Sequence, residues 1–460
     1  MKLFGTNGIR DIVGEGLNAR FVADLVGACA AVHGARGLAV VGTDARTSSP
    51  AFGRIAAGAL SMGGIDVTEL GILPTPAIQY NVPLLGARFA MIITASHNPP
   101  EFNGIKGIAS DGLEFTKETE ARVEAAYAAQ EFPRMPYNRI GTISPDPNGG
   151  ARYVEGILSH VNVETIIKKR LNVILDCGNG TSAVTSTLLL QRLGSRYITL
   201  NATFDGTFPA HNSEPTEANV QGLVKTVRAL GADLGVAHDG DADRAVFVDE
   251  KGNYVSGEKI LALLARECIK EHGGGTVVTP VTSSDSVAEV IAPFGGKVQY
   301  TRVGSPVVTR KMKEVGGIFG GEENGGIIFA EHQMARDGAM SLAKLMDLIA
   351  SSGKSLSTLL AELPPYHLVK VKVRCPVALR EKVLEQVPSI LDSGKDTEVT
   401  TLDGVKVRYP NGWVLVRPSG TEPIYRVFAE SKDLQKAEEL AKNTAKKVEE
   451  IVSGLEAHPA

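Results

Sequence analysis

The sequence predicts an α/β fold, with three similar α/β domains whose sheets are mixed but mostly parallel, and a smaller α+β domain at the C-terminus. The first observation is an alternation, from residue 17 to about residue 365, of amphipathic stretches with short apolar or β-branched runs that end in Gly, Asp, Asn or Ser. Strands separated by helix-length segments are typical of right-handed βαβ crossovers. The second is the length of 460 residues, which favours several domains over one core. The third is a change of order after Pro365, where strands follow one another closely.

The expected elements follow this alternation in chain order. Before residue 365 they are a helix over Asn18–Val32, a strand over Leu38–Gly42, a helix beginning at Ser49, strands over Phe89–Thr94 and Asn172–Asp176, a helix over Thr181–Leu193, apolar runs at Leu234–Ala237 and Ala245–Val248, a helix over Gly257–Lys270 and a strand from Thr276. After it they are a strand at Tyr366–Arg374, a helix at Ala378–Leu391, strands at Glu398–Thr401, Val405–Tyr409, Trp413–Arg417 and Tyr425–Glu430, and a helix at Leu434–Val452. Ligands of parallel sheets bind at the carboxyl ends of the strands.

The composition is that of an ordinary globular protein. Hydrophobic residues make up 43% of the chain, and 48 Lys and Arg against 52 Asp and Glu leave a net charge of -4, so no basic field favours nucleic acid. No apolar stretch approaches the roughly 18 residues of a membrane span, and the N-terminus lacks the apolar segment of a signal peptide. We therefore expect a cytoplasmic protein with neither a nucleic-acid nor a membrane partner. The four cysteines form no C-x-x-C pair and are expected to be reduced, buried thiols.

The first chemical motif is TASHNPP, residues 94–100, which directly follows an apolar run. It places Ser96 and His97 at the carboxyl end of a strand, on a loop that the two prolines keep out of a helix. A serine there could act as a nucleophile, while backbone N–H groups and a cation stabilise the transferred charge. A turn without a catalytic role is the alternative.

The second motif is DGDADR, residues 239–244, between two apolar runs. Its carboxylates Asp239, Asp241 and Asp243 would spread over roughly 13 Å on a straight strand, so the chain must bend for them to share one cation. Three anions held close together repel one another unless a hard divalent cation lies among them, and an all-oxygen ligand set favours Mg²⁺ over zinc. A solvated acidic turn is the alternative.

Two other kinds of site have similar motifs. An EF-hand loop that started at Asp239 would have Glu250 at position 12, but it would also have Arg244 where glycine is needed and strands where helices are needed. A phosphatase with an aspartate nucleophile would need D-x-D-x-T, and no threonine follows Asp241 or Asp243 at that place. The sequence therefore favours a magnesium site.

The third motif is GGEENGG, residues 320–326, which holds two acids and an amide in a flexible frame. A carboxylate at Glu322 and an amide at Asn324 suit the hydroxyl groups of a sugar. A plain hairpin turn explains the glycines as well.

The fourth motif is RPSGTEP, residues 417–423, at the end of a strand in the C-terminal domain. An arginine, two hydroxyls and free backbone N–H groups form an anion cradle that suits a phosphate, and a structural turn is the alternative. The residues of this predicted cradle are Arg417, Ser419, Gly420, Thr421 and, further along, Arg426.

Three basic residues are expected near the first motif. They are Arg10 in FGTNGIR, Arg46 in GTDARTSS and Lys106 in NGIKG. Each could form an ordinary surface ion pair, but together they would supply positive charge and a proton donor near Ser96.

These motifs, in this order, resemble those of the α-D-phosphohexomutase superfamily, which includes phosphoglucomutase, phosphomannomutase and phosphoglucosamine mutase. The resemblance runs from FGTNGIR through GTDARTSS, TASHNPP, NGIKG, DGDADR and GGEENGG to RPSGTEP, and so covers essentially the whole chain. It implies four domains around a central cleft, each contributing one motif. The expected domains are residues 1–150 with a phosphoserine loop, 151–255 with a metal loop, 256–365 with a sugar loop and 366–460 with a phosphate loop.

The resemblance also implies a role for each motif. Ser96 would be the phosphoserine and, with the three aspartates, a ligand of one Mg²⁺. Lys106 would be the general acid and base, with Arg10, His97 and Arg244 at the transfer site. Glu322 and Asn324 would contact sugar hydroxyls, and the cradle of the fourth motif would hold the phosphate that does not react. A sugar 1,6-bisphosphate would prime the enzyme, which would be a monomer or homodimer acting on a hexose phosphate.

The sequence departs from the family pattern at the sugar loop, where members commonly have G-E-x-S-G-H. Asn324 stands in place of the serine, and Gly326 stands in place of the histidine. The opening FGTNGIR and the SGT of the phosphate loop are most similar to phosphoglucosamine mutases and their archaeal relatives, so the expected reaction is glucosamine 6-phosphate to glucosamine 1-phosphate. The alternatives are mannose or glucose phosphates, a metal-dependent sugar phosphatase and a sugar-phosphate sensor.

Overall fold

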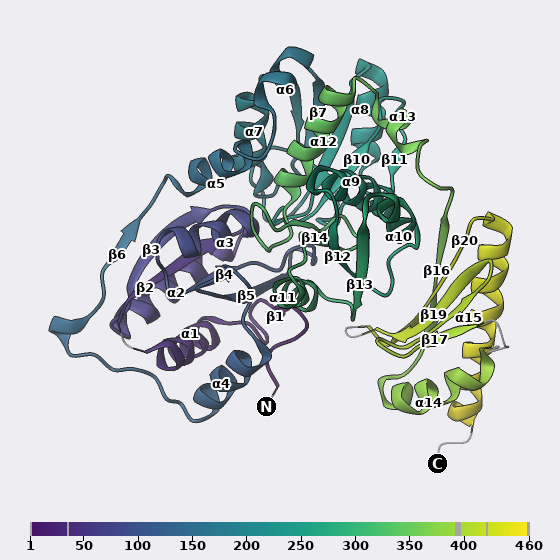
Figure 1. Ribbon diagram of the computed structural model, residues 1–460. Helices are drawn as coiled ribbons and strands as arrows, with labels where there is room; N and C mark the ends of the chain where they lie inside the picture. Colours follow the sequence, from purple (N-terminus) through teal and green to yellow (C-terminus); the bar gives the residue numbers. More distant parts are fainter. Residues whose placement is uncertain (1, 35, 392–396, 420–421, 458–460) are drawn as a thin grey trace.

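The computed structural model describes residues 2–34, 36–391, 397–419 and 422–457. Within these residues the chain forms a six-stranded, a five-stranded and a four-stranded mixed sheet, followed by a five-stranded antiparallel sheet. The sheets follow one another along the chain, and the C-terminal sheet stands to one side, away from the first sheet (Figure 1). The predicted fold class, three α/β units and one α+β domain, is confirmed.

The first sheet has the strand order β1-β5-β4-β2-β3-β6. Its strands are β1 (Ile9–Ile12), β2 (Leu38–Thr43), β3 (Asp66–Ile72), β4 (Phe89–Ile93), β5 (Phe102–Ala109) and β6 (Ile143–Pro145), and its helices are α1 (Ala19–His33), α2 (Ser49–Met62), α3 (Thr75–Leu84), α4 (Lys117–Ala128) and the short η1 (Tyr137–Arg139). The helix expected from Asn18 is α1, and the Asn18 side chain caps it by accepting a hydrogen bond from the backbone N–H of Phe21. Strand β4 is buried along its whole length and runs parallel to β2, as its continuous apolar sequence predicts.

Strand β5 is absent from the elements that the sequence indicates. Two glycines interrupt its apolar pattern, and both are required by close approaches of other parts of the chain. A Cβ at Gly107 would lie 2.2 Å from the ring of Phe115, and one at Gly104 would lie 2.4 Å from the carbonyl oxygen of Ile9. The strand runs antiparallel to β4 and pairs Lys106 with Ile92.

The second and third sheets repeat the α/β layout. The second is β7 (Asn172–Asp176), β8 (Arg196–Leu200), β9 (Leu234–His238), β10 (Ala245–Val248) and β11 (Tyr254–Val255), with α5 (Gly149–Leu158), α6 (Val163–Lys169), α7 (Ser182–Arg192) and α8 (Gln221–Leu230). The third is β12 (Gly275–Pro280), β13 (Gly296–Thr301), β14 (Phe319–Gly321) and β15 (Ile327–Phe329), with α9 (Gly257–His272), α10 (Ser286–Ile291), η2 (Ala292–Phe294), α11 (Ser305–Val315), α12 (Gly338–Ser352) and α13 (Leu356–Leu360). Parallel strands meet in both sheets, and their carboxyl ends carry the loops of interest.

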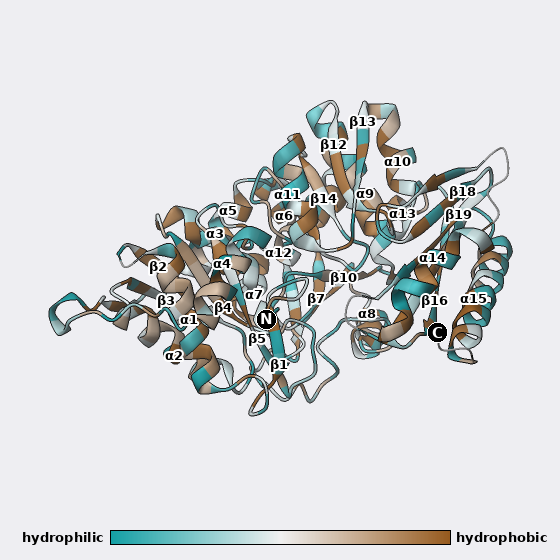
Figure 2. Ribbon diagram, turned by 90° about the horizontal axis from the view of Figure 1, so that it is seen from below, coloured by the Kyte–Doolittle hydropathy of each residue, from teal (hydrophilic) through white to brown (hydrophobic). Residues whose placement is uncertain are grey.

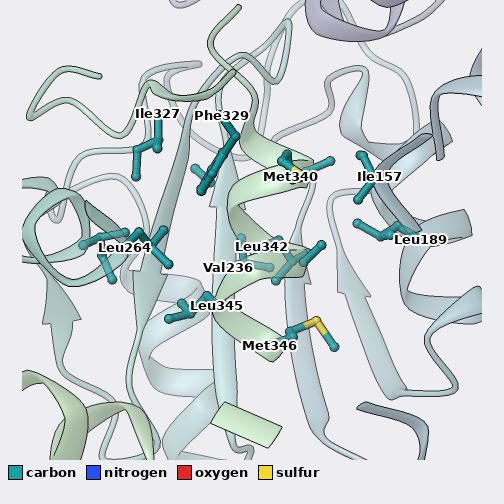
Figure 3. Packing of buried hydrophobic residues seen from close by; sticks show 14 of the residues in the cluster. Ile157, Leu189, Val236, Leu264, Ile327, Phe329, Met340, Leu342, Leu345 and Met346 are labelled. Atoms are coloured by element: carbon teal, nitrogen blue, oxygen red, sulfur yellow. The ribbon is translucent and has the colours of Figure 1, made fainter. Parts of the chain in front are cut away.

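The three α/β units share one hydrophobic core. Helix α12 follows the third sheet in the chain but packs against α5, α6 and α7 of the second unit. Figure 3 shows Met340, Leu342, Leu345 and Met346 of this helix among Val236 of β9, Ile327 and Phe329 of β15, Leu264 of α9, Leu189 of α7 and Ile157 of α5. The grouping in space therefore differs from the order of the chain, because a helix from the 256–365 segment completes the core of the preceding unit.

The C-terminal domain has a core of its own. It consists of β16 (His367–Arg374), η3 (Val377–Leu379), α14 (Arg380–Ile390), β17 (Glu398–Thr400), β18 (Val405–Tyr409), β19 (Gly412–Pro418), β20 (Ile424–Ser431) and α15 (Leu434–Ala457). Hydrophobic and hydrophilic residues are mixed along α15, as expected of a helix with one face on a sheet (Figure 2). A small cluster of Val281 with Trp413, Leu415 and Phe428 joins this domain to the third unit.

All four cysteines are buried and unpaired, as predicted. Among the described residues, no helix combines the length and the apolar character needed to cross a membrane.

Candidate active site

Ser96 lies at the carboxyl end of β4, where the strand gives way to the loop of residues 94–100. Its backbone φ of 52° is in the left-handed region, which a residue with a side chain adopts only when its surroundings enforce it. The backbone N–H of Ser96 donates to Thr94 Oγ1 at 2.9 Å, and the side chain is fully buried. The loop thus holds one hydroxyl in a fixed, water-shielded position.

Arg46 holds this loop in place. Its Nη1 donates to the carbonyl oxygens of Pro99 and Phe102 at 2.6 and 2.8 Å, and its Nη2 donates to those of Ser96 and Asn98 at 2.9 and 2.6 Å. Its Nε pairs with Asp44 Oδ2 at 3.2 Å. Arg46 therefore fastens the backbone of the loop, whereas the sequence predicted only a source of positive charge near Ser96.

The three aspartates of DGDADR lie in the turn between β9 and β10, next to Ser96. The turn bends at Ala242, whose φ is 53°, and it brings one carboxylate oxygen of each aspartate within 4.8 Å of the others. Ser96 Oγ donates to Asp239 Oδ2 at 2.9 Å. The second unit thus presents its acidic turn directly to the serine of the first.

One oxygen of each aspartate is bonded to a basic, hydroxyl or backbone N–H group. Asp241 Oδ2 accepts hydrogen bonds from Lys106 Nζ at 2.8 Å and from Thr75 Oγ1 at 2.7 Å. Asp243 Oδ2 pairs with Arg336, and Asp239 Oδ1 accepts from the backbone N–H of Arg244 at 3.1 Å.

Two other oxygens of the cluster are different. Asp241 Oδ1 and Asp243 Oδ1 are buried, and neither accepts a hydrogen bond. Buried carboxylate oxygens without a partner are costly, and a divalent cation among them would remove that cost. The all-oxygen set of three carboxylates and a hydroxyl fits a hard cation of the magnesium type.

Burial and mutual repulsion set the charges of the aspartates. Burial, followed by the neighbouring charges of Asp243 and Asp241, raises the pKa of Asp239 well above its ordinary value. Burial would also raise the pKa of Asp241, but the Lys106 charge and the hydrogen bonds from Lys106 and Thr75 outweigh it and bring this pKa below its ordinary value. The cluster therefore holds one strongly ionised carboxylate and one that ionises reluctantly unless a cation is present.

The predicted basic residues come together at this place. Lys106, on β5, is buried and lies 3.7 Å from Asp243 Oδ2 in addition to its bond with Asp241. Arg10, on β1, donates from Nη1 to Asn98 Oδ1 in the serine loop at 2.7 Å.

His97 lies 3.3 Å from Ser96 Oγ through Nδ1. Burial, followed by the charges of Arg244 and Arg10, lowers the pKa of His97 to about 2. The imidazole is therefore neutral at any ordinary pH. It can accept a hydrogen bond at one ring nitrogen, but it contributes no charge.

The sugar-loop residues lie between β14 and β15. Glu322 is buried, accepts a hydrogen bond from the backbone N–H of Gly304 at 3.1 Å through Oε1, and pairs with Arg336 Nη1 at 3.2 Å through Oε2. Asn324 Oδ1 accepts from the backbone N–H of Gly326 at 3.1 Å. The carbonyl oxygen of Gly325 accepts from the backbone N–H of Ala245, directly after the acidic turn. The third unit is thus joined to the metal loop by main chain and side chain.

The loop of residues 417–423, which the sequence predicts to bind phosphate, is described in part. Arg417 Nε pairs with Asp403 Oδ2 at 3.2 Å, and the same oxygen accepts a hydrogen bond from the backbone N–H of Val303, next to Gly304. Ser419 Oγ accepts from the backbone N–H of Glu422, whose carboxylate pairs with Arg426. The predicted Gly420 and Thr421 lie outside the described residues.

Several residues of the site escaped the sequence reasoning. Thr75, at the start of α3, and Arg336, before α12, contact the aspartates from other units. Ser213 Oγ donates to the carbonyl oxygen of Ser96 at 3.0 Å and accepts from the backbone N–H of Gly240, so it joins the serine loop to the acidic turn. Glu214 pairs with Arg244 at 3.4 Å. None of these four residues stands in a sequence motif, so only the folded structure shows that they belong to the site.

Four domain families match the chain in succession. They are the phosphoglucomutase/phosphomannomutase alpha/beta/alpha domains I, II and III, over residues 1–134, 151–252 and 256–366, and the phosphoglucomutase/phosphomannomutase C-terminal domain, over residues 368–447.

Whole-chain relatives agree with these matches. A phosphoglucomutase/phosphomannomutase of Thermococcus kodakarensis is 42% identical over 98% of this chain and 100% of its own. A phosphoglucosamine/phosphogalactosamine mutase of Sulfurisphaera tokodaii is 37% identical over 98% of this chain and 99% of its own. A crystal structure of a phosphoglucomutase/phosphomannomutase family protein from Burkholderia thailandensis has the same fold, with a TM-score of 0.87, 24% identity and coverage of 98% of this chain and 97% of that one.

Proposed function

The chain belongs to the phosphoglucomutase/phosphomannomutase family and is a hexose phosphate mutase, and on this premise we propose that it works through a phosphorylated Ser96 and a hexose bisphosphate intermediate. The observation that carries the proposal is the hydrogen bond from Ser96 Oγ to Asp239 Oδ2, which places the hydroxyl against the acidic cluster. A phosphoryl group on Ser96 would lie beside the unpartnered oxygens of Asp241 and Asp243.

A Mg²⁺ ion held by Ser96, Asp239, Asp241 and Asp243 would neutralise the charge on the phosphoryl oxygens. The residues of the chain supply the rest of the arrangement. Arg46 and Ser213 fix the backbone at Ser96, so the reacting oxygen has one position. Because the Ser96 side chain is fully buried, bulk water has little access to it, and this limits loss of the phosphoryl group by hydrolysis.

The transfer runs in two steps that reverse one another. In the first, the P–O bond to Ser96 breaks while a bond forms to a free hydroxyl of the hexose phosphate, and Lys106, acting as an unprotonated amine, takes the proton of that hydroxyl. In the second, the bisphosphate is turned round, its other phosphoryl group moves to Ser96, and Lys106 returns the proton to the sugar oxygen. Lys106 suits this role because its Nζ lies between Asp241 and Asp243, at the edge of the cluster.

The sugar and its second phosphate would be held by the third unit and the C-terminal domain. We assign the sugar hydroxyls to Glu322 and Asn324. The phosphate that does not react is assigned to Arg417, Ser419, Gly420 and Thr421, and to Arg426, which lies opposite Arg417 in the neighbouring strand. Arg244 and Arg10 would face the transferred group, since both lie beside the serine loop or the aspartates.

Glucosamine 6-phosphate is the proposed substrate, with glucosamine 1-phosphate as the product. The phosphoglucosamine/phosphogalactosamine mutase of Sulfurisphaera tokodaii supports an amino sugar. The phosphoglucomutase/phosphomannomutase of Thermococcus kodakarensis makes glucose and mannose phosphates the second candidate. A hexose 1,6-bisphosphate is the proposed activator, because it can phosphorylate Ser96 and leave a usable monophosphate.

A ³¹P NMR time course tests both the reaction and the sugar. The protein with Mg²⁺ and a catalytic amount of hexose 1,6-bisphosphate is given glucosamine, glucose and mannose 1-phosphates in separate runs. Each 6-phosphate that appears identifies a substrate, and the relative rates rank the sugars. Release of inorganic phosphate alone would replace the mutase by a phosphatase, and unchanged spectra would leave only binding.

A further inference from the structure

Arg336 links the metal loop to the sugar loop from a position outside both motifs. Its guanidinium bridges the carboxylates of Asp243 and Glu322, with the bond to Glu322 at 3.2 Å. The side chain is 6% exposed, so the bridge is shielded from water and salt.

The backbone beside Arg336 is fixed. The next residue, Asp337, caps α12 by accepting from the backbone N–H of Met340 at 2.9 Å, and it also accepts from the hydroxyl of Tyr153 at 2.5 Å. The backbone N–H of Asp337 donates to the carbonyl oxygen of Ile327, on β15, at 2.8 Å. The Arg336 side chain thus starts from a rigid point next to the sugar loop.

The arginine also fills the space left by a glycine. A Cβ built at Gly326 would lie 2.3 Å from Cδ of Arg336 and 3.2 Å from its Cγ. A side chain at position 326 and Arg336 in its observed position therefore exclude one another. The absence of a side chain at Gly326 is what allows the guanidinium to reach both carboxylates.

The bridge leaves usable oxygens on both acids. Arg336 takes Oδ2 of Asp243, and Oδ1, which lies 3.8 Å from Arg244 Nε, accepts no hydrogen bond. On Glu322 it takes Oε2, while the backbone of Gly304 takes Oε1. Each oxygen of Glu322 has accepted one hydrogen bond and can accept a second one from a hydroxyl group.

We propose that Arg336, admitted by Gly326, is a positioning residue that orients Glu322 for the sugar, an inference that rests on the proposed function of that loop. A planar guanidinium with two donor edges can hold two carboxylates in a fixed geometry, which an ammonium cannot do. It acts through Glu322 and touches no reacting atom.

The test compares ligands with and without a sugar. The affinities of glucosamine 6-phosphate and of inorganic phosphate are measured by calorimetry on the full chain with saturating Mg²⁺, because Arg336 also pairs with Asp243, a proposed Mg²⁺ ligand. Arg336→Met is expected to weaken binding of the sugar phosphate by about 10–100-fold and to leave inorganic phosphate unchanged. Arg336→Lys is expected to recover only part of the loss. The matched control is Arg152→Met, which removes a partly buried arginine paired with Asp146 outside the site.

Gly326→Ala provides an independent route to the same effect. The backbone of Gly326 is outside the left-handed region, so alanine is tolerated there, and the new methyl group must displace Arg336 while every charge is kept. It decides the question if Arg336→Met fails to fold. The new methyl group would also lie 3.2 Å from Asn324 Oδ1, so the loss of sugar-phosphate affinity in this variant should be at least that of Arg336→Met. The double variant should be no weaker than Gly326→Ala alone, because both changes remove the Arg336 interaction.

Three results would overturn the proposal. They are wild-type affinity for glucosamine 6-phosphate in both single variants, equal weakening of sugar phosphate and inorganic phosphate, and losses that multiply in the double variant. Failure of the proposed function would look different. In that case the wild-type protein itself would convert no hexose phosphate in the ³¹P NMR assay, whatever the variants bind.

Discussion

The hydroxyl of Ser96 donates a 2.9 Å hydrogen bond to Asp239 Oδ2, although 143 positions separate the two residues in the chain. The serine belongs to the first sheet and the aspartate to the second, so the contact depends on the way the two units dock. Their shared core and the hydroxyl of Ser213, which bonds to both loops, fix that docking. The contact between Ser96 and the acidic turn thus exists only in the folded tertiary structure.

Replacement of Ser96 tests the covalent role of its hydroxyl. In Ser96→Ala the acceptor for the phosphoryl group is gone, so we expect loss of nearly all mutase turnover with an unchanged melting temperature. Intact-mass measurement after treatment with hexose 1,6-bisphosphate should show a phosphorylated wild type and an unmodified variant. Ser159→Ala, an exposed serine on the surface, is the control. Steady-state turnover at the wild-type rate in a clean preparation of Ser96→Ala would exclude the phosphoserine.

Replacement of Lys106 tests the proton transfer. Lys106→Met removes the ammonium group beside Asp241 and Asp243, and we expect turnover to fall by about 10²–10⁴-fold, the usual contribution of a general acid or base. The loss should appear in kcat, since the sugar and its second phosphate are held elsewhere. Lys442→Met on the exposed face of α15 should retain activity. Turnover within twofold of wild type would remove Lys106 from the chemistry.

Addition of Mg²⁺ tests the acidic cluster without any substrate. A cation that binds only the folded protein raises the melting temperature by mass action. We expect Mg²⁺ to raise it in the wild type and to have little effect in Asp241→Asn or Asp243→Asn, whereas Asp146→Asn should behave like the wild type. Because burial and its acidic neighbours raise the pKa of Asp239, the effect of Mg²⁺ should fade as the pH falls through that raised value. Equal responses in all four proteins would place the cation elsewhere.

His211 provides a pH-dependent contribution to stability. Its Nε2 lies 3.3 Å from Asp176 Oδ2, and the interaction with this carboxylate raises the pKa of His211 against the opposing effect of burial. The protonated pair therefore stabilises the folded protein fully below the unfolded pKa of about 6.5, and this stabilisation is lost as the pH rises through the raised folded value.

Urea unfolding of the wild type and His211→Gln, at a series of pH values, measures this effect. The difference in the free energy of unfolding should be largest on the acid side of about pH 6.5 and should shrink toward pH 9. A difference that grew with pH would show that the charged pair does not form. Because His211 is close to Ser213, the variant also reports how firmly this segment is held over the Ser96 loop.

The sequence predicts most of the fold because the central strands have a recognisable pattern. Strands such as β4 and β7 are short apolar runs with polar residues at the carboxyl end, and buried parallel strands require that pattern. Strand β5 lacks this pattern, because close packing against Phe115 and β1 requires glycines that interrupt its apolar residues. The Lys106 that it carries was found from its motif and not from its strand.

The site is predictable where its residues stand in one stretch of chain. This holds for the three aspartates, which stand in one turn, and for Ser96, which stands in one loop with His97. Thr75 and Arg336 do not, because their contacts with Asp241 and Asp243 join different units and have no periodic or local pattern. Arg46 stands in a motif, but its contacts with main-chain oxygens of the Ser96 loop could not be predicted from the sequence.

Helix α12 has a consequence for the synthesis of the chain. The second sheet is complete once β11 has left the ribosome, but α12 lies in the core beside α5 and α7, and it is made only after the whole third sheet. In a nascent chain, the apolar face of the second unit that α12 covers therefore stays exposed until Ser352 has emerged from the ribosome. Arg336, which pairs with Asp243 of the acidic turn, is made just before α12, so this pair also forms late in translation. A chain truncated before α12 would be a target for chaperones and proteases.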